Sequence, residues 1–201
     1  MPDVVDVVFS RASVRFFKSD PIPREVLRKI LKAGTRAPVA GGVEKWFFII
    51  VTSEGKRRAI HELLKKAHIL YATKVLRNPY PEESVRKWVE RMEAGMYLAP
   101  AYIAGYIDVR EPRHRDEYLS EERIFLHHSI AAAFENMILT AWSMGIGSVW
   151  LGVPLYIKEE FNKVLEPPEG HELAGILALG YPKEKPKPRK RKPIQEVTKY
   201  I

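Results

Sequence analysis

The stretch Glu135–Pro154, ENMILTAWSMGIGSVWLGVP, decides the fold. Its first half continues a helical pattern that is predicted to run from Glu121 to Met144. The second half of this helix is apolar on nearly every side, which is typical of a helix at the centre of a core or an interface. Glycines then end the helix, and residues 147–153, GSVWLGV, favour a strand. The stretch therefore predicts a buried helix that turns into a buried strand.

A membrane span is the alternative for the same region. Met137 to Ile157 contains no charged residue and is long enough to cross a bilayer. Glycines and Pro154 interrupt its second half, however, and a broken backbone exposed to lipid would leave polar groups unpaired. We therefore expect no membrane span here.

Outward from this stretch, helical and strand patterns alternate. Apolar residues at helical spacing predict further helices at residues 23–34, 54–67, 82–95 and 157–165. Runs of β-branched and aromatic residues predict strands at residues 45–53, 100–109 and 172–182. Strands interleaved with helices around one very long helix indicate an α/β or α+β sandwich.

Composition limits the class of protein. The 201 residues suit a single domain, in which residues 1–182 form the core and residues 183–201 form a basic arm too rich in proline to pack alone. Cysteine is absent, which excludes disulfides and thiolate chemistry. The start MPDVVDVVF does not resemble a secretion signal, so we expect a cytoplasmic protein. Abundant Lys, Arg and Glu without cysteine is also typical of thermophilic proteins.

The net charge of +8 indicates an anionic partner, which is a nucleic acid, a membrane surface or a phosphorylated ligand. The charge is concentrated in two places. One is Ser10–Pro23, SRASVRFFKSDPIP, and the other is Pro182–Pro193, PKEKPKPRKRKP. Two such clusters can meet on one small anion.

Four segments resemble, in order, the landmarks of the FMN-dependent nitroreductase family. They are RASVRFF, ILKAGTRAPVAGGVEKWFFIIV, ENMILTAWSMGIGSVWLGVP and ILALGYPKEKPKPRKRKPIQEV. The resemblance implies an α+β fold with a central, mostly antiparallel sheet flanked by helices, and a homodimer built on the long helix and an exchanged C-terminal arm. Residues 65–123 lack a clear match and correspond to a variable excursion that shapes the substrate pocket.

By this resemblance, two basic pairs hold the FMN phosphate. Arg11, Ser13 and Arg15 match the family's opening Arg-x-Ser-x-Arg element, and Arg189 and Arg191 match its basic-x-Arg pair. Arginine suits phosphate because its planar fork donates two hydrogen bonds at once. The alternatives are solvated charges before a turn for the first group and a nucleic-acid patch for the second.

Two further segments would contact the flavin ring. Along its edge would lie Trp150, Leu151 and Gly152, with a backbone N–H near the reactive N5. The alternative is that these glycines only end a helix before a strand. The loop RAPVAGGVEKW departs from the family pattern, because Val39, Gly42, Glu44 and Lys45 replace Ser, Asn, Gln and Pro. The loop residues predicted to contact FMN are Pro38, Val39, Ala40, Gly42 and Glu44.

Histidine and the excursion leave open questions. No histidine spacing matches a metal site, so His61, His68, His127 and His128 are expected to be hydrogen-bonded imidazoles in the core or at an interface.

In the excursion, six large side chains line a pocket or form its local core; they are Tyr71, Tyr80, Trp88, Met92, Met96 and Tyr97.

The resemblance implies an FMN-dependent oxidoreductase. NADH or NADPH would give a hydride to flavin N5 and leave, and a nitroaromatic, quinone or related small molecule would then take the electrons, with no catalytic side chain required. The alternatives are a flavin-binding protein of the same fold that does not oxidise NAD(P)H, and a basic nucleic-acid-binding module. We expect neither nucleic acid nor membrane as the partner.

Overall fold

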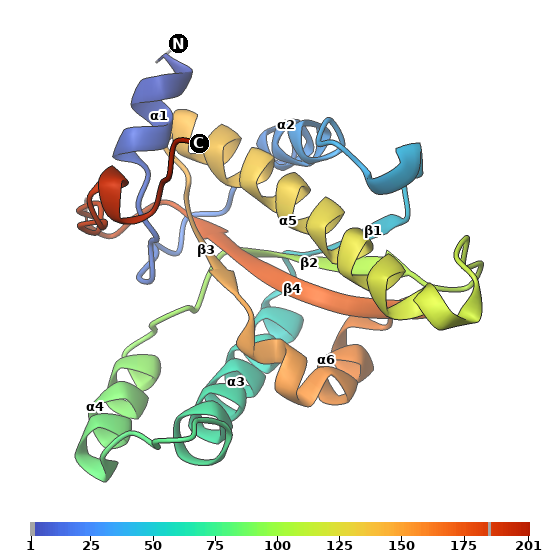
Figure 1. Ribbon diagram of the computed structural model, residues 1–201. Coiled ribbons are helices and arrows are strands. Elements are labelled where there is room, and N and C mark those ends of the chain that lie inside the picture. The colour runs from blue at the N-terminus through green and yellow to red at the C-terminus, as the bar shows by residue number, and fades with distance from the viewer. Residues whose placement is uncertain (1–2, 185) are drawn as a thin grey trace.

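The computed structural model describes residues 3–184 and 186–201. Four strands form one antiparallel sheet in the order β1-β2-β4-β3 (Figure 1). The strands are β1 (Trp46–Val51), β2 (Ala101–Asp108), β3 (Gly147–Leu151) and β4 (His171–Gly180). The sheet therefore has two central strands, β2 and β4, and two edge strands, β1 and β3.

Helices cover both faces of the sheet, which confirms the predicted α+β sandwich (Figure 1). The helices are α1 (Val4–Ser10), α2 (Arg24–Gly34), α3 (Glu54–Leu70), α4 (Glu82–Glu93), α5 (Leu119–Ser143) and α6 (Lys158–Leu165). Helices α2 and α5 lie on one face, and α3 and α6 lie on the other, with α4 packed against α3.

Strand β2 shows why the sheet is the centre of the core. Its side chains alternate between the two faces, as they must in a strand. Tyr102 and Tyr106 belong to the apolar cluster of α3 and α6, whereas Ile103 and Ile107 belong to the cluster of α2 and α5. All four are fully buried, so β2 is apolar along its whole length because helices cover both of its faces.

The long helix α5 packs one side against α2 and the sheet. A Cβ on Gly34 of α2 would lie 2.2 Å from Met137 Cε, so the two helices touch at this glycine. Gly105 of β2 leaves room in the same way for the ring of Phe134. The opposite side of α5 is open, with Ile124 and Phe125 exposed. The apolar residues of α5 therefore serve two surfaces, of which this chain covers one.

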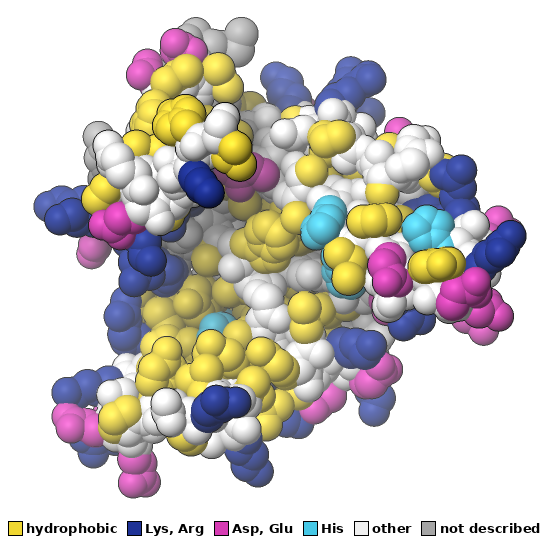
Figure 2. All heavy atoms as spheres, viewed as in Figure 1, with side chains coloured by type: hydrophobic (Ala, Val, Ile, Leu, Met, Phe, Trp, Pro, Cys, Tyr) yellow, Lys and Arg dark blue, Asp and Glu magenta, His cyan; other side chains and the backbone are white. Residues whose placement is uncertain are grey.

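The first helix, α1, was not expected from the sequence. Asp3 caps it by accepting a hydrogen bond from the Val5 N–H at 3.2 Å. Four of its apolar side chains, Val4, Val5, Val8 and Phe9, are exposed, and yellow side chains cover this helix in Figure 2. Only Val7 of α1 is buried, so this seven-residue helix shows no clear helical period in its sequence.

Two further segments of the sequence can be located in the structure, the basic arm and the apolar run in the middle of the chain. Residues 187–201 of the basic arm are exposed, with one 3-10 turn at Ile194–Glu196. Within Met137 to Ile157, α5 ends and β3 follows, as predicted, and a 3-10 turn then spans Val153–Ile157. Among the helices of the described residues, none is long and apolar enough to cross a membrane.

Candidate functional site

The segment Arg11–Arg15 lies against the edge strand β3. Ser13 forms a parallel bridge with Ser148, and the Val14 N–H donates to the Ser148 carbonyl at 2.9 Å. A Cβ on Gly147 would come within 2.4 Å of the Val14 side chain, so the glycine is needed for this close approach. The sequence motif is thus held at the start of β3 by the backbone.

The next residues join this segment to the root of the basic arm. Phe17 forms an antiparallel bridge with Pro182, and the Lys183 N–H donates to the Phe16 carbonyl at 3.1 Å. The first basic cluster and the beginning of the second therefore lie together, although they are more than 160 residues apart in the sequence.

The arginines of both clusters have no acidic partner among the described residues. Arg11 and Arg15 take part in no ion pair among these residues. The side chain of Arg15 donates one long hydrogen bond, from Nη1 to the Ser13 carbonyl at 3.4 Å. Arg189 and Arg191 are exposed on the arm. These guanidinium groups are therefore available to an anion, and a phosphate fits them.

At the other end of β3, Trp150 and Leu151 are held by packing. The Trp150 ring meets the Phe134 ring edge-on, with centroids 5.2 Å apart, over the space that Gly175 leaves in β4. Leu151 is buried, whereas a Cβ on Gly152 would meet nothing within 4 Å. The backbone at Gly152 therefore faces open space, which a planar ring can approach closely.

The predicted loop lies at the opposite edge of the sheet, before β1. It forms a 3-10 turn, Ala40–Gly42, in which Gly41 and Gly42 have φ values of 59° and 70°. The Ala40 N–H donates to Ser129 Oγ of α5 at 3.0 Å. Pro38 and Glu44 are exposed, and Val39 is half-buried.

The predicted cofactor residues thus form two groups within one chain. Residues 11–15 and 150–152 share the edge strand β3, and the loop 38–44 precedes the edge strand β1. Three strand spacings separate these edges, which is about 14 Å. One chain therefore does not bring the loop to the ligand that the β3 edge would hold.

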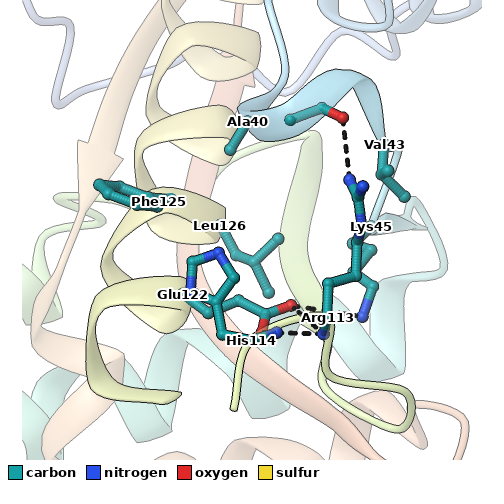
Figure 3. Close-up of a pocket in the computed structure, with 9 residues that line it drawn as sticks. Ala40, Val43, Lys45, Arg113, His114, Glu122, Phe125 and Leu126 are labelled. Atoms are coloured by element: carbon teal, nitrogen blue, oxygen red, sulfur yellow. Dashed lines mark hydrogen bonds and ion pairs between the residues drawn. The ribbon is translucent and has the colours of Figure 1, made fainter. Parts of the chain in front are cut away.

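Sequence reasoning missed a polar site beside this loop, which we call the Glu122 corner; it comprises Lys45, Arg113, His114 and Glu122 around a cavity of about 230 Å³ (Figure 3). The Glu122 carboxylate accepts hydrogen bonds from the backbone N–H groups of Arg113 and His114 at 2.9–3.1 Å. It also lies 3.7 Å from Lys45 Nζ. Arg113 Nη1 donates to the Gly41 carbonyl at 2.9 Å. The corner therefore ties the 38–44 loop to α5.

Burial and hydrogen bonding have opposite effects on the pKa of Glu122. Burial opposes ionisation of Glu122, but the two backbone donors and Lys45 outweigh it, so the pKa of Glu122 is lowered. Lys45, which stands where the resemblance predicts a proline, also donates to the Glu111 carbonyl. The signal available in the sequence was an acidic residue in the first turn of α5 after a basic run, but nothing in it indicates burial.

The six large side chains of the excursion divide into two sets. Met92 and Met96 are fully buried in the core. The other four line a second hollow with His68, between α3 and α4, which we call the aromatic cavity; its rings are His68, Tyr71, Tyr80, Trp88 and Tyr97. Both interpretations of the excursion were therefore partly correct.

The histidine expectation is confirmed for two residues. His61 Nε2 lies 3.0 Å from the Met96 carbonyl oxygen, and His68 Nδ1 lies 2.9 Å from that of Leu64. Both rings are buried. Across the residues that the structure describes, no cluster of three metal-ligating side chains occurs. Asn136 also finds a backbone partner, since its Nδ2 donates to the Ala33 carbonyl at 3.2 Å.

Comparison with known proteins shows to which family this chain belongs. The family model described as the Nitroreductase family matches residues 8–181, most of the chain. The chain belongs to the Nitroreductase family. It is 26% identical to an NADH dehydrogenase of Thermus thermophilus, over 97% of this chain and 94% of that protein.

Two solved structures also match over the whole chain. One is a nitroreductase with bound FMN from Bacteroides fragilis, with a TM-score of 0.71 and 25% identity over 100% of both chains. The other is a BluB-like flavoprotein from Clostridium difficile, with a TM-score of 0.78 and 25% identity over 100% of both chains. The predicted resemblance and fold class are thereby confirmed.

Proposed function

We propose that this member of the Nitroreductase family is an FMN-dependent oxidoreductase that takes a hydride from NADH or NADPH. A small electron acceptor, which is a nitroaromatic, a quinone or a related molecule, then takes the electrons. One observation carries the proposal. The arginines of residues 11–15, without acidic partners among the described residues, are pinned to the same edge strand that ends in the open backbone at Gly152.

The spacing along β3 supports FMN as the ligand. Ser148, which pairs with Ser13, and Gly152 are four residues apart, which is about 13 Å in a strand. A phosphate at Arg11 and Arg15 would thus leave room for a ribityl chain before a ring at Gly152. The FMN-bound relative from Bacteroides fragilis supports the same ligand.

When bound, FMN supplies the hydride and electron chemistry, so the chain itself needs no nucleophile or base. We infer that Arg11 and Arg15 bind the phosphate and that the Ser13 hydroxyl donates to the phosphate or to the ribityl chain. Arg189 and Arg191 would add charge from the arm. The backbone N–H groups around Gly152 would stabilise the negative charge of the reduced ring without titrating.

We further propose that the enzyme is a homodimer. Support comes from three large apolar residues that are exposed, which are Ile124 and Phe125 of α5 and Phe9 of α1. The separation of loop 38–44 from the β3 edge also favours a second chain, because a partner's loop would complete a site that one chain leaves open.

A second candidate function is flavin binding without NAD(P)H oxidation. The observation that favours it is the loop 38–44, in which Val39, Gly42 and Glu44 stand where the family pattern has Ser, Asn and Gln. Val39 offers no polar side chain and Gly42 has none. A nucleic-acid-binding module is the remaining alternative, and it predicts salt-dependent binding to DNA or RNA without flavin.

The deciding experiment is the visible spectrum of the purified protein with FMN, before and after NADH or NADPH is added without oxygen. Bound flavin that bleaches with either nucleotide is expected. Flavin that binds but does not bleach would favour the second candidate. A protein that binds no flavin would contradict the proposal and direct attention to nucleic acid.

A matched pair of variants tests the phosphate site. Arg15→Ala is expected to weaken FMN binding about tenfold or more, because it removes a charge-assisted hydrogen bond. Arg24→Ala changes an equally exposed arginine at the start of α2 and is expected to leave FMN affinity unchanged. Equal affinities of the two variants in a flavin-fluorescence titration would place the phosphate elsewhere.

A further inference from the structure

The loop between α4 and β2 contains an unusual backbone conformation. Tyr97 in this loop has a φ of 69°, a left-handed value that a residue with a bulky side chain rarely adopts. Glu166 also has a positive φ, but it ends α6, and a left-handed residue is ordinary at the end of a helix. The end of α4 uses Gly95 in this way, with a φ of 95°, so the end of that helix does not account for Tyr97.

Three contacts hold Tyr97 in this conformation. Its N–H donates to the Arg15 carbonyl at 2.7 Å, and its carbonyl accepts from the Tyr102 hydroxyl at 2.7 Å. Its buried ring stacks on the His68 ring, with centroids 5.2 Å and planes 11° apart. A strained conformation persists only where the surroundings over-determine it, and such positions cluster at functional sites. Of the three partners, Arg15 belongs to the motif that is proposed to bind the phosphate.

The hydroxyl of Tyr102 holds this loop from the core. Tyr102 lies in β2 and is fully buried. Its hydroxyl donates to the Tyr97 carbonyl and accepts from the Ala99 N–H at 3.2 Å, so it binds two backbone groups of the loop at once. Burial raises the pKa of Tyr102 to about 12, so the hydroxyl keeps its proton at pH 7. The loop is therefore tied to the sheet by one buried side chain.

The backbone of the Arg11–Arg15 motif is held by two different parts of the fold. The Val14 N–H donates to the Ser148 carbonyl of β3 at 2.9 Å, and the next residue, Arg15, accepts from the Tyr97 N–H. The Arg15 side chain, by contrast, is exposed and donates one hydrogen bond, which is long. The place from which the Arg15 guanidinium extends is therefore set by the backbone contacts and not by a side-chain partner.

Such an anchor matters for a phosphate site in particular. A guanidinium binds phosphate through charge-assisted hydrogen bonds whose strength depends on geometry. Holding the binding group in place beforehand lowers the cost of binding, and a displacement of about 1 Å can cost a large factor in a reaction that needs exact positions. The open backbone at Gly152 lies beyond the other end of β3, so a shift at Arg15 leaves the proposed ring site unchanged.

We propose that Tyr97 and Tyr102 are positioning residues of the phosphate site, because their hydrogen bonds hold the backbone of Arg15 where its guanidinium can bind a phosphate monoester. This inference rests on the proposed function in taking FMN as the ligand. Neither tyrosine needs to touch the ligand. The proposal therefore predicts that the preference for FMN over riboflavin, which lacks only the phosphate, depends on the Tyr102 hydroxyl.

The test compares Tyr102→Phe with Tyr106→Phe in fluorescence titrations of the full, flavin-free chain with FMN and with riboflavin. Tyr106 lies on the same strand, is also fully buried, and donates from its hydroxyl to Asn162 Oδ1 at 3.1 Å, away from the motif. Both variants lose one buried hydroxyl, so both should melt at a lower temperature. Tyr102→Phe is expected to weaken FMN binding about tenfold and riboflavin binding less than about twofold, whereas Tyr106→Phe is expected to change neither.

Two results would overturn the proposal. One is an unchanged ratio of FMN to riboflavin affinity in Tyr102→Phe, which includes the case in which both flavins bind equally less well because the fold is loosened. The other comes from the double variant Tyr102→Phe with Arg15→Ala. If Tyr102 acts through Arg15, Tyr102→Phe is expected to have no further effect on FMN affinity once the guanidinium is gone. Fully additive losses would contradict this.

A second pair of variants tests the loop if Tyr102→Phe does not fold. Tyr97→Asn and Tyr97→Leu both remove the ring, but asparagine adopts a left-handed backbone more readily than leucine. Tyr97→Leu is therefore expected to lower the ratio of FMN to riboflavin affinity further than Tyr97→Asn. Equal ratios in the two variants would contradict the role of the Tyr97 backbone.

Reduction by nucleotide separates this inference from the proposed function. If the unmodified protein binds FMN but neither NADH nor NADPH bleaches it, the proposed function fails, and the FMN and riboflavin titrations still decide the role of Tyr102. If the flavin bleaches and the affinity ratio is the same in Tyr102→Phe as in the unmodified protein, the positioning role fails and the proposed function stands. A protein that binds neither flavin contradicts both.

Discussion

The Glu122 corner and the aromatic cavity are two hollows of one molecule with opposite chemistry. In the corner, the buried carboxylate of Glu122 accepts from two backbone N–H groups and lies beside Lys45, and Arg113 is bonded to the Gly41 carbonyl. In the aromatic cavity, the ring faces of Trp88 and Tyr80 remain partly open.

This difference separates a hollow whose polar groups are paired with one another from a hollow whose ring faces remain partly uncovered. A polar cluster whose donors and acceptors are paired with one another gains little from a ligand, and it holds together the segments that supply its residues. Partly exposed aromatic rings that are held in place gain stacking energy when a ligand covers them. We therefore expect changes in the corner to lower the free energy of unfolding. In the cavity, the buried His68 contributes to stability, whereas the exposed Tyr80 can be changed at little cost.

The largest expected effect is the loss of the corner's carboxylate. Glu122→Ala leaves Lys45, whose side chain is 11% exposed, without its counter-charge and leaves the Arg113 and His114 N–H groups unpaired. Removing one partner of a buried pair costs about 3–5 kcal/mol in the free energy of unfolding. Urea denaturation measures the loss.

Two control variants sharpen this prediction. Glu121→Ala changes the exposed neighbour of Glu122 and is expected to cost less than about 0.5 kcal/mol. The double variant Lys45→Met with Glu122→Gln removes both charges and is expected to recover part of the loss, since no buried charge remains. A Glu122→Ala protein as stable as Glu121→Ala would show that the corner is not structural.

The next largest effect is the pH dependence that His68 imposes on stability. The pKa of His68 is about 4 in the folded chain against an ordinary 6.5, so the unfolded chain binds a proton first as the pH falls. The stability from His68 is complete above pH 6.5 and is lost progressively down to about pH 4. A shift of this size corresponds to about 3 kcal/mol.

Denaturation midpoints between pH 7 and pH 4 check this expectation. His68→Phe keeps an aromatic ring in the cavity and removes the proton-binding group, so the stability of this variant should fall less steeply over the same range. If stability falls equally steeply with pH in the unmodified protein and in His68→Phe, burial of His68 is not the cause of the pH dependence.

The smallest expected effect concerns the backbone of the loop that the corner holds. Gly41 has a φ of 59°, and a Cβ there would lie 2.9 Å from Arg113 Nη1. Gly41→Ala is expected to cost about 1–2 kcal/mol because alanine is disfavoured in left-handed backbone. Gly55→Ala, in α3 with open space around it, is expected to stabilise by up to about 1 kcal/mol. Thermal melting of the two variants should therefore shift in opposite directions.

Much of the fold could be predicted because its elements carry strong local patterns. The apolar run of β2 and the long pattern of α5 identify the central layers without any tertiary information. The helix α1 escaped prediction because this chain buries only one of its apolar side chains, Val7. Burial creates the periodicity by which a helix is recognised, so an uncovered helix shows little of it.

The candidate site was predictable only where single residues carry the chemistry. The Arg11–Arg15 motif could be proposed because it resembles the opening Arg-x-Ser-x-Arg element of the family, and guanidinium groups suit a phosphate. Glu122 could not, since an acidic residue at the start of a helix is usually solvated. His68 and Trp88 could not be paired from sequence, because 20 residues of chain separate two rings whose centroids lie 4.1 Å apart.

The sequence by itself determined the layers of this protein, the position of its basic motifs and its family resemblance, because these depend on local periodicity and on the chemistry of individual side chains. Only the tertiary structure decided that loop 38–44 and residues 150–152 lie at opposite edges of the sheet. It alone also separated the satisfied corner from the open cavity. Strand order and burial arise from contacts between distant segments, and no local pattern encodes them.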